Sequence, residues 1–170
     1  MRRKIDYLLL PLICLISLNA MAQGNLNMTK MESEMLRLMS SPDKDAFMQV
    51  TEKLKAECQK QGNERLFYSA WGNQSTHEAT HQNYMLAEEI ADQIAAYAEE
   101  QNSYWGNYIA LHTKAVNALQ KQDYAAAEEG IKRAVDFRHK YFPGESAGED
   151  LQELMKIANH RKDKKAGLMY

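Results

Sequence analysis

The residues best suited to chemistry form one short motif, His77-Glu78-Ala79-Thr80-His81. Residues four positions apart share one face of a helix, so the two imidazoles could hold a Zn²⁺ ion while Glu78 polarises a bound water. Glu100, separated from His81 by eighteen residues, would supply a third ligand. The motif therefore raises one function to be weighed, a small zinc peptidase whose site consists of His77, Glu78, His81 and Glu100.

The surroundings of this motif argue against such a site. The spacing resembles that of gluzincin peptidases, which hold the substrate backbone with an edge β-strand, and no long segment here alternates apolar and polar residues as a strand would. Glu99 and Glu100 lie in a glutamate-rich stretch. The motif also ends just before a turn at residues 82–84, so we expect both histidines on a solvated helix end. The sequence therefore favours no metal site, no cofactor and no catalytic residue.

Other chemistries lack their signatures. The sequence has no G-x-S-x-G motif and no glycine-rich phosphate loop. The catalytic motifs of histidine kinases are absent too, so this chain is not expected to phosphorylate anything. The formal net charge is −2, and the one basic cluster, at residues 160–165, is short, which argues against a nucleic-acid partner. A binding function is therefore expected.

Residues 1–22 have the layout of a cleavable secretory signal. A basic start at residues 2–4 precedes an apolar run at residues 7–18, and Ala20-Met21-Ala22 supplies small residues before the expected cleavage point. The run is too short for a comfortable membrane span. We therefore expect export to the periplasm or the exterior. Cys58 would then be the one remaining cysteine, and its phase with apolar neighbours predicts a buried thiol.

The rest of the chain predicts helices. Three prolines and eight glycines leave long segments in which apolar residues recur at helical spacing. A Met-rich helix is expected within residues 23–41, and a helical repeat domain within residues 42–170. The predicted helices of that domain cover residues 42–61, 63–81, 83–100, 103–121, 124–142 and 149–160. Because each has one apolar face, neighbouring helices are expected to pair as antiparallel hairpins.

One motif occurs twice, 40 residues apart. Gln82-Asn83-Tyr84-x-x-Ala87-Glu88-Glu89 returns as Gln122-Asp123-Tyr124-x-x-Ala127-Glu128-Glu129, and a fainter copy begins at Phe47. We expect the tyrosines and alanines of both copies to be mostly buried. Self-similarity at a fixed period marks a protein built from stacked repeats. The predicted fold class is therefore all-α, a solenoid of antiparallel helix hairpins.

The register Tyr124, Ala127, Ile131, Ala134 resembles that of the tetratricopeptide repeat, in which small residues let neighbouring helices approach closely. The resemblance covers residues 47–170, although the period is 40 instead of about 34 and glutamine stands where the family has glycine. It implies a binding surface lined by the first helix of each hairpin. The candidate protein-binding residues carried over from the family are Thr76, Ala79, His112, Val116, Leu119, Gln120, Leu151, Met155 and Asn159.

Two longer stretches, at residues 64–74 and 135–161, give the chain a look similar to the periplasmic sensor regions of Bacteroidetes histidine kinases. This resemblance implies an exported, non-enzymatic interaction or sensor module that binds a protein or peptide. Such a module would be the input region of a two-component signalling protein. It would pass binding to a membrane kinase through a C-terminal part that this chain lacks.

The last residues predict an incomplete repeat. Ala166 and Tyr170 stand close to where an earlier repeat places Ala127 and Ile131. We therefore expect an array that continues past this chain, with an apolar end that either self-associates or frays. The side chains expected to lack a full partner there are Leu151, Leu154, Met155 and Ala158.

Overall fold

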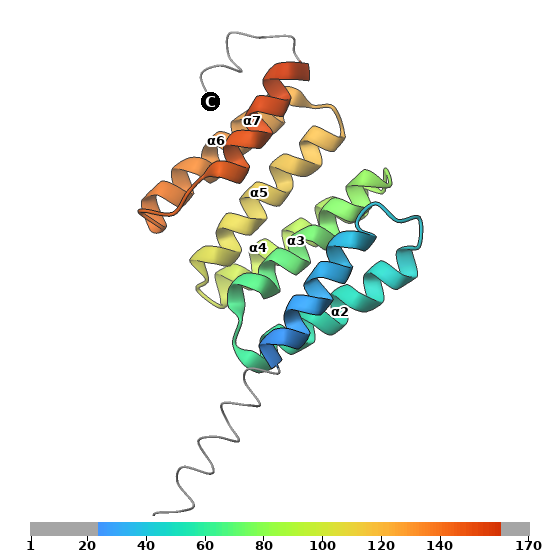
Figure 1. Ribbon diagram of the computed structural model, residues 1–170. Coiled ribbons are helices and arrows are strands. Elements are labelled where there is room, and N and C mark those ends of the chain that lie inside the picture. The colour runs from blue at the N-terminus through green and yellow to red at the C-terminus, as the bar shows by residue number, and fades with distance from the viewer. Residues whose placement is uncertain (1–23, 161–170) are drawn as a thin grey trace, which may run out of the picture. The chain divides into compact units, whose positions relative to one another are not determined.

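A computed structural model describes residues 24–160, which consist of helices joined by short connections (Figure 1). No strand occurs in this part of the chain, so the expected all-α hairpin solenoid is confirmed. The expected signal at residues 1–22 and the expected incomplete repeat after residue 160 lie outside the described residues. The helices are residues 24–38, α2 (Lys44–Gln61), α3 (Glu64–Thr80), α4 (Tyr84–Glu100), α5 (Tyr104–Gln120), α6 (Tyr124–Tyr141) and α7 (Gly148–His160).

The chain divides after Asn63 into two compact units. In the first unit, the helix at residues 24–38 packs against α2, and Met28 Sδ lies 3.9 Å from Cys58 Sγ. Cys58 is fully buried, as expected. Burial raises the pKa of its thiol to about 11, and the nearby charge of Glu32 acts in the same direction. The thiol therefore stays protonated at neutral pH and serves as a small apolar core group.

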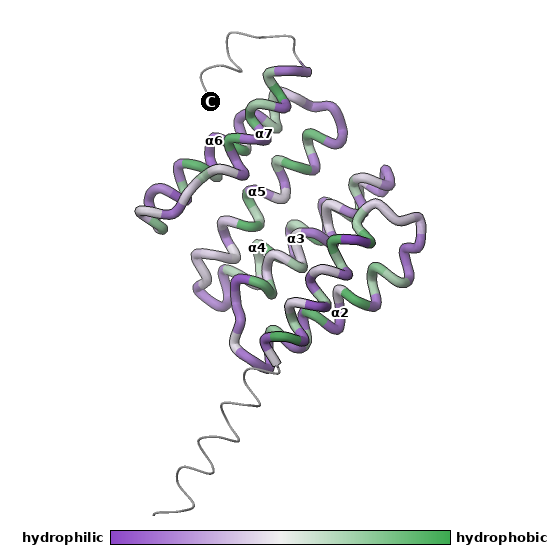
Figure 2. The backbone as a smooth tube through the Cα atoms, in the orientation of Figure 1, coloured by the Kyte–Doolittle hydropathy of each residue, from purple (hydrophilic) through white to green (hydrophobic). Residues whose placement is uncertain are grey.

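The second unit stacks α3 to α7. The helix α3 packs against α4 and α5, and α5 packs against α4, α6 and α7. Two hairpins result, α3–α4 and α5–α6, with α7 placed as the first helix of a third. Figure 2 shows apolar positions recurring along each of these helices. This repeating pattern lets each hairpin bury its apolar faces against the next.

The turns that follow four of the helices share one backbone conformation. One residue within two positions of each helix end has φ between 54° and 67°, the left-handed region, and these residues are 20 positions apart. They are Gly62, Gln82, Asn102 and Gln122. At each turn the next amide donates back into the helix, as Ser103 N does to Ala98 O at 2.8 Å, which satisfies a carbonyl at the helix end. Each helix and its turn thus occupy 20 residues, and each hairpin occupies the 40 residues of the sequence period.

The repeated motif begins the second helix of each hairpin. Asp123 Oδ1 accepts a hydrogen bond from the Ala126 amide at 3.1 Å and so caps α6. Ala87 and Ala127 are fully buried, as expected. Their small side chains let the second helix lie close to its neighbours.

The motif tyrosines are only half-buried, which corrects the expectation that they are core residues. Tyr84 Oη donates to Gln120 O at 3.3 Å, and the Tyr124 ring stacks on His160 with 5.4 Å between centroids. Each tyrosine therefore reaches from the start of its own helix to the end of the first helix of the next repeat. That position lies at the rim of the helix stack, where one ring edge remains in solvent.

The fainter third copy of the repeat is confirmed by burial. The helices α2, α4 and α6 bury residues at the same four positions, each spaced 40 from its equivalent. The sets are Phe47, Thr51, Leu54 and Cys58; Ala87, Ala91, Ile94 and Ala98; and Ala127, Ile131, Ala134 and Arg138. Only the last set ends on a charged residue, and that exception marks the candidate site.

Candidate functional site

Two buried tyrosines, Tyr68 and Tyr108, occupy equivalent positions of α3 and α5, 40 residues apart. Small residues surround the first. A Cβ built on Gly106 would lie 2.5 Å from Tyr68 Cζ and 2.6 Å from Ala98 Cβ, so only glycine fits there. The junction at Tyr68, where α3, α4 and α5 meet, is therefore held by close apolar packing.

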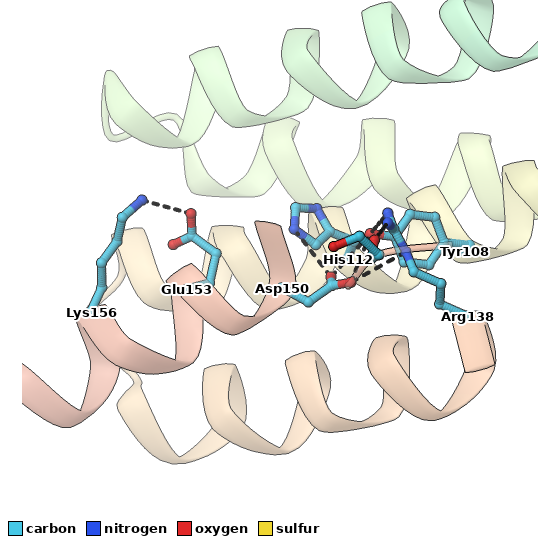
Figure 3. A network of polar contacts seen from close by, with 7 residues as sticks. Tyr108, His112, Arg138, Asp150, Glu153 and Lys156 are labelled. Carbon is cyan, nitrogen blue, oxygen red and sulfur yellow. Dashed lines mark hydrogen bonds and ion pairs between the residues drawn. The ribbon is translucent and has the colours of Figure 1, made fainter. Parts of the chain in front are cut away.

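The equivalent junction at Tyr108 is polar. Tyr108 Oη donates to the Asp150 carboxylate, at 3.0 Å from Oδ1 and 3.1 Å from Oδ2, and accepts from Arg138 Nη2 at 2.5 Å (Figure 3). Arg138 Nε lies 3.4 Å from Asp150 Oδ2, and the guanidinium lies over the Tyr108 ring, 4.3 Å from its centroid. Asp150 is fully buried and Arg138 nearly so. The pair thus keeps opposite charges together inside the protein, as burial of charge requires.

His112 completes the group. Its Nε2 lies 3.6 Å from Asp150 Oδ1, and its ring is 5.9 Å from that of Tyr108. Burial lowers the pKa of His112 because it penalises the imidazolium, whereas the charges of Asp150, Glu153 and Glu149 act in the opposite direction. We call Tyr108, His112, Arg138 and Asp150 the Tyr108 cluster.

The phenol of Tyr108 is held as a hydrogen-bond donor. Burial raises its pKa far above the usual value, and the carboxylate of Asp150 raises it further. The hydroxyl therefore keeps its proton throughout the physiological range. This arrangement contains a carboxylate, an imidazole and a phenol, but these groups contact one another. The carboxylate is paired with Arg138 and faces the interior.

The cluster joins three helices and a loop. Asp150 lies in the first turn of α7 and Arg138 in the last turn of α6, where each charge also suits the helix dipole. Arg138 Nη1 donates to Ser146 O in the connection between those helices. The cluster can therefore fix the position at which α7 packs against α5 and α6.

A second buried polar group lies near the middle of the unit. Asn117 Nδ2 donates to Ser75 Oγ at 2.8 Å, and Ser75 Oγ donates to Ala87 O at 2.6 Å. The three residues come from α5, α3 and α4. This group ties the first hairpin to the helix that follows it, without any ionisable side chain.

The His-Glu-x-x-His motif does not lie on a solvated helix end. His77 is fully buried and Glu78 is 1% exposed, whereas His81 is exposed. Glu78 Oε2 accepts from Asn83 Nδ2 at 2.9 Å, and the two histidine rings lie 4.2 Å apart. The expectation missed this because His77 and Glu78 lie in the last turn of α3, where their burial depends on tertiary packing and not on the local sequence.

The structure does not assemble the proposed zinc ligands. Glu100 ends α4, whose 17 residues span about 24 Å, whereas His81 lies just before the start of that helix. Within residues 24–160, no group of three or more His, Cys, Asp or Glu side chains is placed to hold a metal ion. The alternative of a zinc peptidase therefore lacks its third ligand in this geometry.

The candidate binding residues fall into three classes. Ala79 is 1% exposed, and His112 belongs to the Tyr108 cluster, so neither offers a free surface. Those at the surface or half-buried are Thr76, Val116, Leu119, Gln120, Leu151, Met155 and Asn159. Of the Tyr108 cluster, His112 alone was predicted to be a binding residue. A comparison at the 40-residue spacing would have singled out Arg138 and Asp150, because they stand where the previous repeat has Ala98 and Ala110.

Comparison of the chain with models of known families, with curated proteins and with solved structures finds no match. Between residues 24 and 160, none of the helices combines the length and the apolar character needed to cross a membrane. A function is therefore inferred from the geometry of the helices and their side chains.

Proposed function

We propose that this chain is a non-enzymatic, tetratricopeptide-like module that binds a protein or peptide on the face formed by α3, α5 and α7. One observation carries the proposal. Thr76 and Val116 occupy equivalent positions on adjacent packed helices, and both remain partly accessible. Lys156 continues the row on α7 and is exposed. A row of accessible side chains across stacked first helices is the binding geometry of helical repeat proteins.

The same face carries the other accessible candidates. Leu119 is half-buried, and Gln120 and Asn159 are exposed, at the ends of α5 and α7. Apolar and amide side chains side by side suit a partner that presents both a backbone to hydrogen-bond and an apolar side chain to bury. Catalysis is not part of the proposal, because the buried ionisable groups pair with one another.

The resemblance of the sequence to periplasmic sensor regions of histidine kinases extends the proposal. In that form the module is exported, its signal peptide is removed before Gln23, and partner binding is passed to a membrane kinase. An intact-mass measurement of the exported protein would check the first step. A mass that starts at Gln23 supports export with cleavage, and a mass that retains residues 1–22 contradicts it.

The binding face can be tested with selected peptides. Peptides would be selected from a random library on the whole chain, and their affinities measured by fluorescence anisotropy. Val116→Glu on α5 should weaken the selected peptides by at least about tenfold, because it places an uncompensated charge on the contact face. Arg133→Glu, on the exposed side of α6, is the matched control and should leave affinity unchanged. Equal effects of both variants, or no selectable peptide, would contradict the proposal.

The zinc alternative has its own direct check. Untagged chain, purified without chelators, should contain far less than one zinc per molecule by elemental analysis. Stoichiometric zinc that His81→Ala removes would replace the binding module with the peptidase. His81 is the residue to change because it is exposed, so its loss leaves the core intact.

A further inference from the structure

His112 is the member of the Tyr108 cluster whose charge can change near neutral pH. It stands 40 positions after Gly72, so the previous repeat has no side chain at this place. The His112 side chain is 21% exposed, whereas its Nε2 atom is buried and lies 3.6 Å from Asp150 Oδ1. Because part of the ring meets solvent, it can exchange protons with the medium. The charge that it gains then lies beside the buried carboxylate.

The buried carboxylate already has its counter-charge. Asp150 is fully buried, and Arg138 Nε lies 3.4 Å from Asp150 Oδ2. Tyr108 Oη also donates to both carboxylate oxygens, and its phenol keeps its proton. Charges inside a protein are tolerated when they are paired with opposite charges. With His112 neutral the cluster has one cation and one anion, so a proton on His112 adds a second cation without a second buried anion.

The other charges near His112 do not compensate for that proton. Glu153 and Glu149 act on the ring from α7, and Arg138 acts on it from α6. Among the described residues, none of the charges that shift its pKa comes from α3 or α4. Glu153 Oε1 is paired with Lys156 Nζ at 2.7 Å (Figure 3), and Glu149 is exposed to solvent. Burial therefore outweighs these carboxylates and lowers the pKa of His112.

Apolar contacts also hold α7 in place. Leu154 and Ile157 belong to one buried cluster with residues of α5 and α6, and Ala158 is 4% exposed. The expectation that Leu154 and Ala158 lack a partner is therefore wrong, because α7 packs against α5 and α6 there. Leu151, named in the same expectation, is half-buried, and Met155 is exposed. The charged contact at the first turn of α7 thus acts together with apolar packing along the rest of the helix.

Movement of α7 changes the surroundings of His112. Asp150 of α7 contacts both His112 on α5 and Arg138 on α6. When α7 moves away, water reaches the imidazole, so its charged form is less penalised than in the docked state. Protonation therefore favours the released position of α7. Since α7 carries Lys156 and Asn159 of the proposed binding face, that face depends on the docking of α7.

We propose that His112 is a pH-sensitive switch whose protonation releases α7 from α5 and α6, so that the binding face loses its third helix under mildly acidic conditions. The inference rests on the proposed function of that face and adds its regulation. An unperturbed histidine has a pKa of about 6.5, and the docked state holds the pKa of His112 below that value. Docking is therefore complete above about pH 7 and weakens as the pH falls.

Hydrogen exchange followed by mass spectrometry would test the switch in the whole chain. Exchange would be compared at about pH 7.5 and about pH 5.5, after correction for the intrinsic effect of pH. At the lower pH, amides at residues 151–158 of α7 should lose protection by about threefold or more, and those at residues 88–98 of α4 should change less. His112→Gln should keep α7 equally protected at both pH values. His139→Gln, at an exposed position of α6, is the matched control and should retain the response.

The link to the binding face needs a second measurement on the same variants. Peptides selected on the chain at neutral pH, and free of histidine, aspartate and glutamate, should bind about threefold or more weakly at the lower pH. His112→Gln should abolish that difference.

Each outcome separates the switch from the binding face. Equal loss of protection in α4 and α7, or a loss in α7 that His112→Gln does not remove, would overturn the switch. Peptides that bind equally well at both pH values while α7 is released would overturn the regulation of the face. Acid release of α7 in a chain that selects no peptide would support the switch and contradict the proposed binding function.

Discussion

The junctions at Tyr68 and Tyr108 occupy the same place in successive repeats but are stabilised by different kinds of interaction. Around Tyr68, close packing requires small residues, and Gly106 and Ala98 leave no room for a further atom. Around Tyr108, a carboxylate, a guanidinium and an imidazole fill the equivalent space (Figure 3). The replaced pairs are Gly72 and His112, Ala98 and Arg138, Gly106 and Ser146, and Ala110 and Asp150.

The difference shows what a repeat can change without losing its fold. The helix positions, the left-handed turns and the buried alanines all keep their 40-residue spacing, while one interface exchanges apolar contacts for a buried ion pair. A buried ion pair contributes little net stability compared with good apolar packing, but removing one partner is costly. The Tyr108 cluster therefore makes the docking of α7 sensitive to charge, and the junction at Tyr68 does not share that sensitivity.

The largest expected effect is the loss of one charge from the Tyr108 cluster. Asp150→Ala should destabilise the second unit by about 3 to 5 kcal/mol, because it leaves the Arg138 guanidinium buried without its counter-charge. Urea unfolding followed by circular dichroism would measure it. Asp136→Ala, at an exposed position of α6, is the control and should change stability by less than about 0.5 kcal/mol.

The Tyr68 junction should respond instead to volume. Gly106→Ala should cost about 1 to 3 kcal/mol, because the new methyl group meets the Tyr68 ring and Ala98. The equivalent Ser146→Ala should cost about 1 kcal/mol or less, because it removes only the hydrogen bond from the Gly148 amide to Ser146 Oγ. Equal losses in the two variants would show that the junctions do not differ in packing.

The pH dependence of stability should separate the junctions as well. The folded pKa of His112 lies below the unfolded value of 6.5, so the unfolded chain binds the proton more readily. Stability is therefore complete above that value and falls as the pH drops below it. His112→Gln should remove this part of the acid sensitivity. An unchanged pH profile between 7 and 5 would contradict the assignment.

The smallest expected effect concerns the turns that both hairpins share. Gln82 and Gln122 adopt φ of 65° and 63°, a conformation that glycine takes without strain. Gln122→Gly should stabilise the fold by about 0.5 to 1 kcal/mol. Lys121→Gly, at a neighbouring residue with φ of −74°, should give no gain. Thermal unfolding of the two variants would measure the difference, and a gain in both would rule out the backbone explanation.

The fold was largely predictable from the sequence, because helical periodicity, turn residues and the 40-residue spacing all depend on local patterns. Burial at the rim was not, since the exposure of Tyr84 and Tyr124 depends on where the next repeat ends. The Tyr108 cluster was missed for a related reason. Arg138 and Asp150 each look like ordinary surface charges within their own helices, and only tertiary packing brings them together. His77 was misplaced because its burial in the last turn of α3 depends on tertiary packing, which the motif itself does not reveal.

The most direct test of the central claim is a double-mutant cycle on the ion pair. The claim is that Arg138 and Asp150 hold the junction at Tyr108 as a coupled pair of charges, at positions where the junction at Tyr68 has two alanines. Arg138→Ala combined with Asp150→Ala restores the residues of the earlier repeat, Ala98 and Ala110. By urea unfolding, the double variant should be more stable than either single variant, with a coupling of about 2 kcal/mol or more. A double variant whose loss equals the sum of the two single losses would contradict the account.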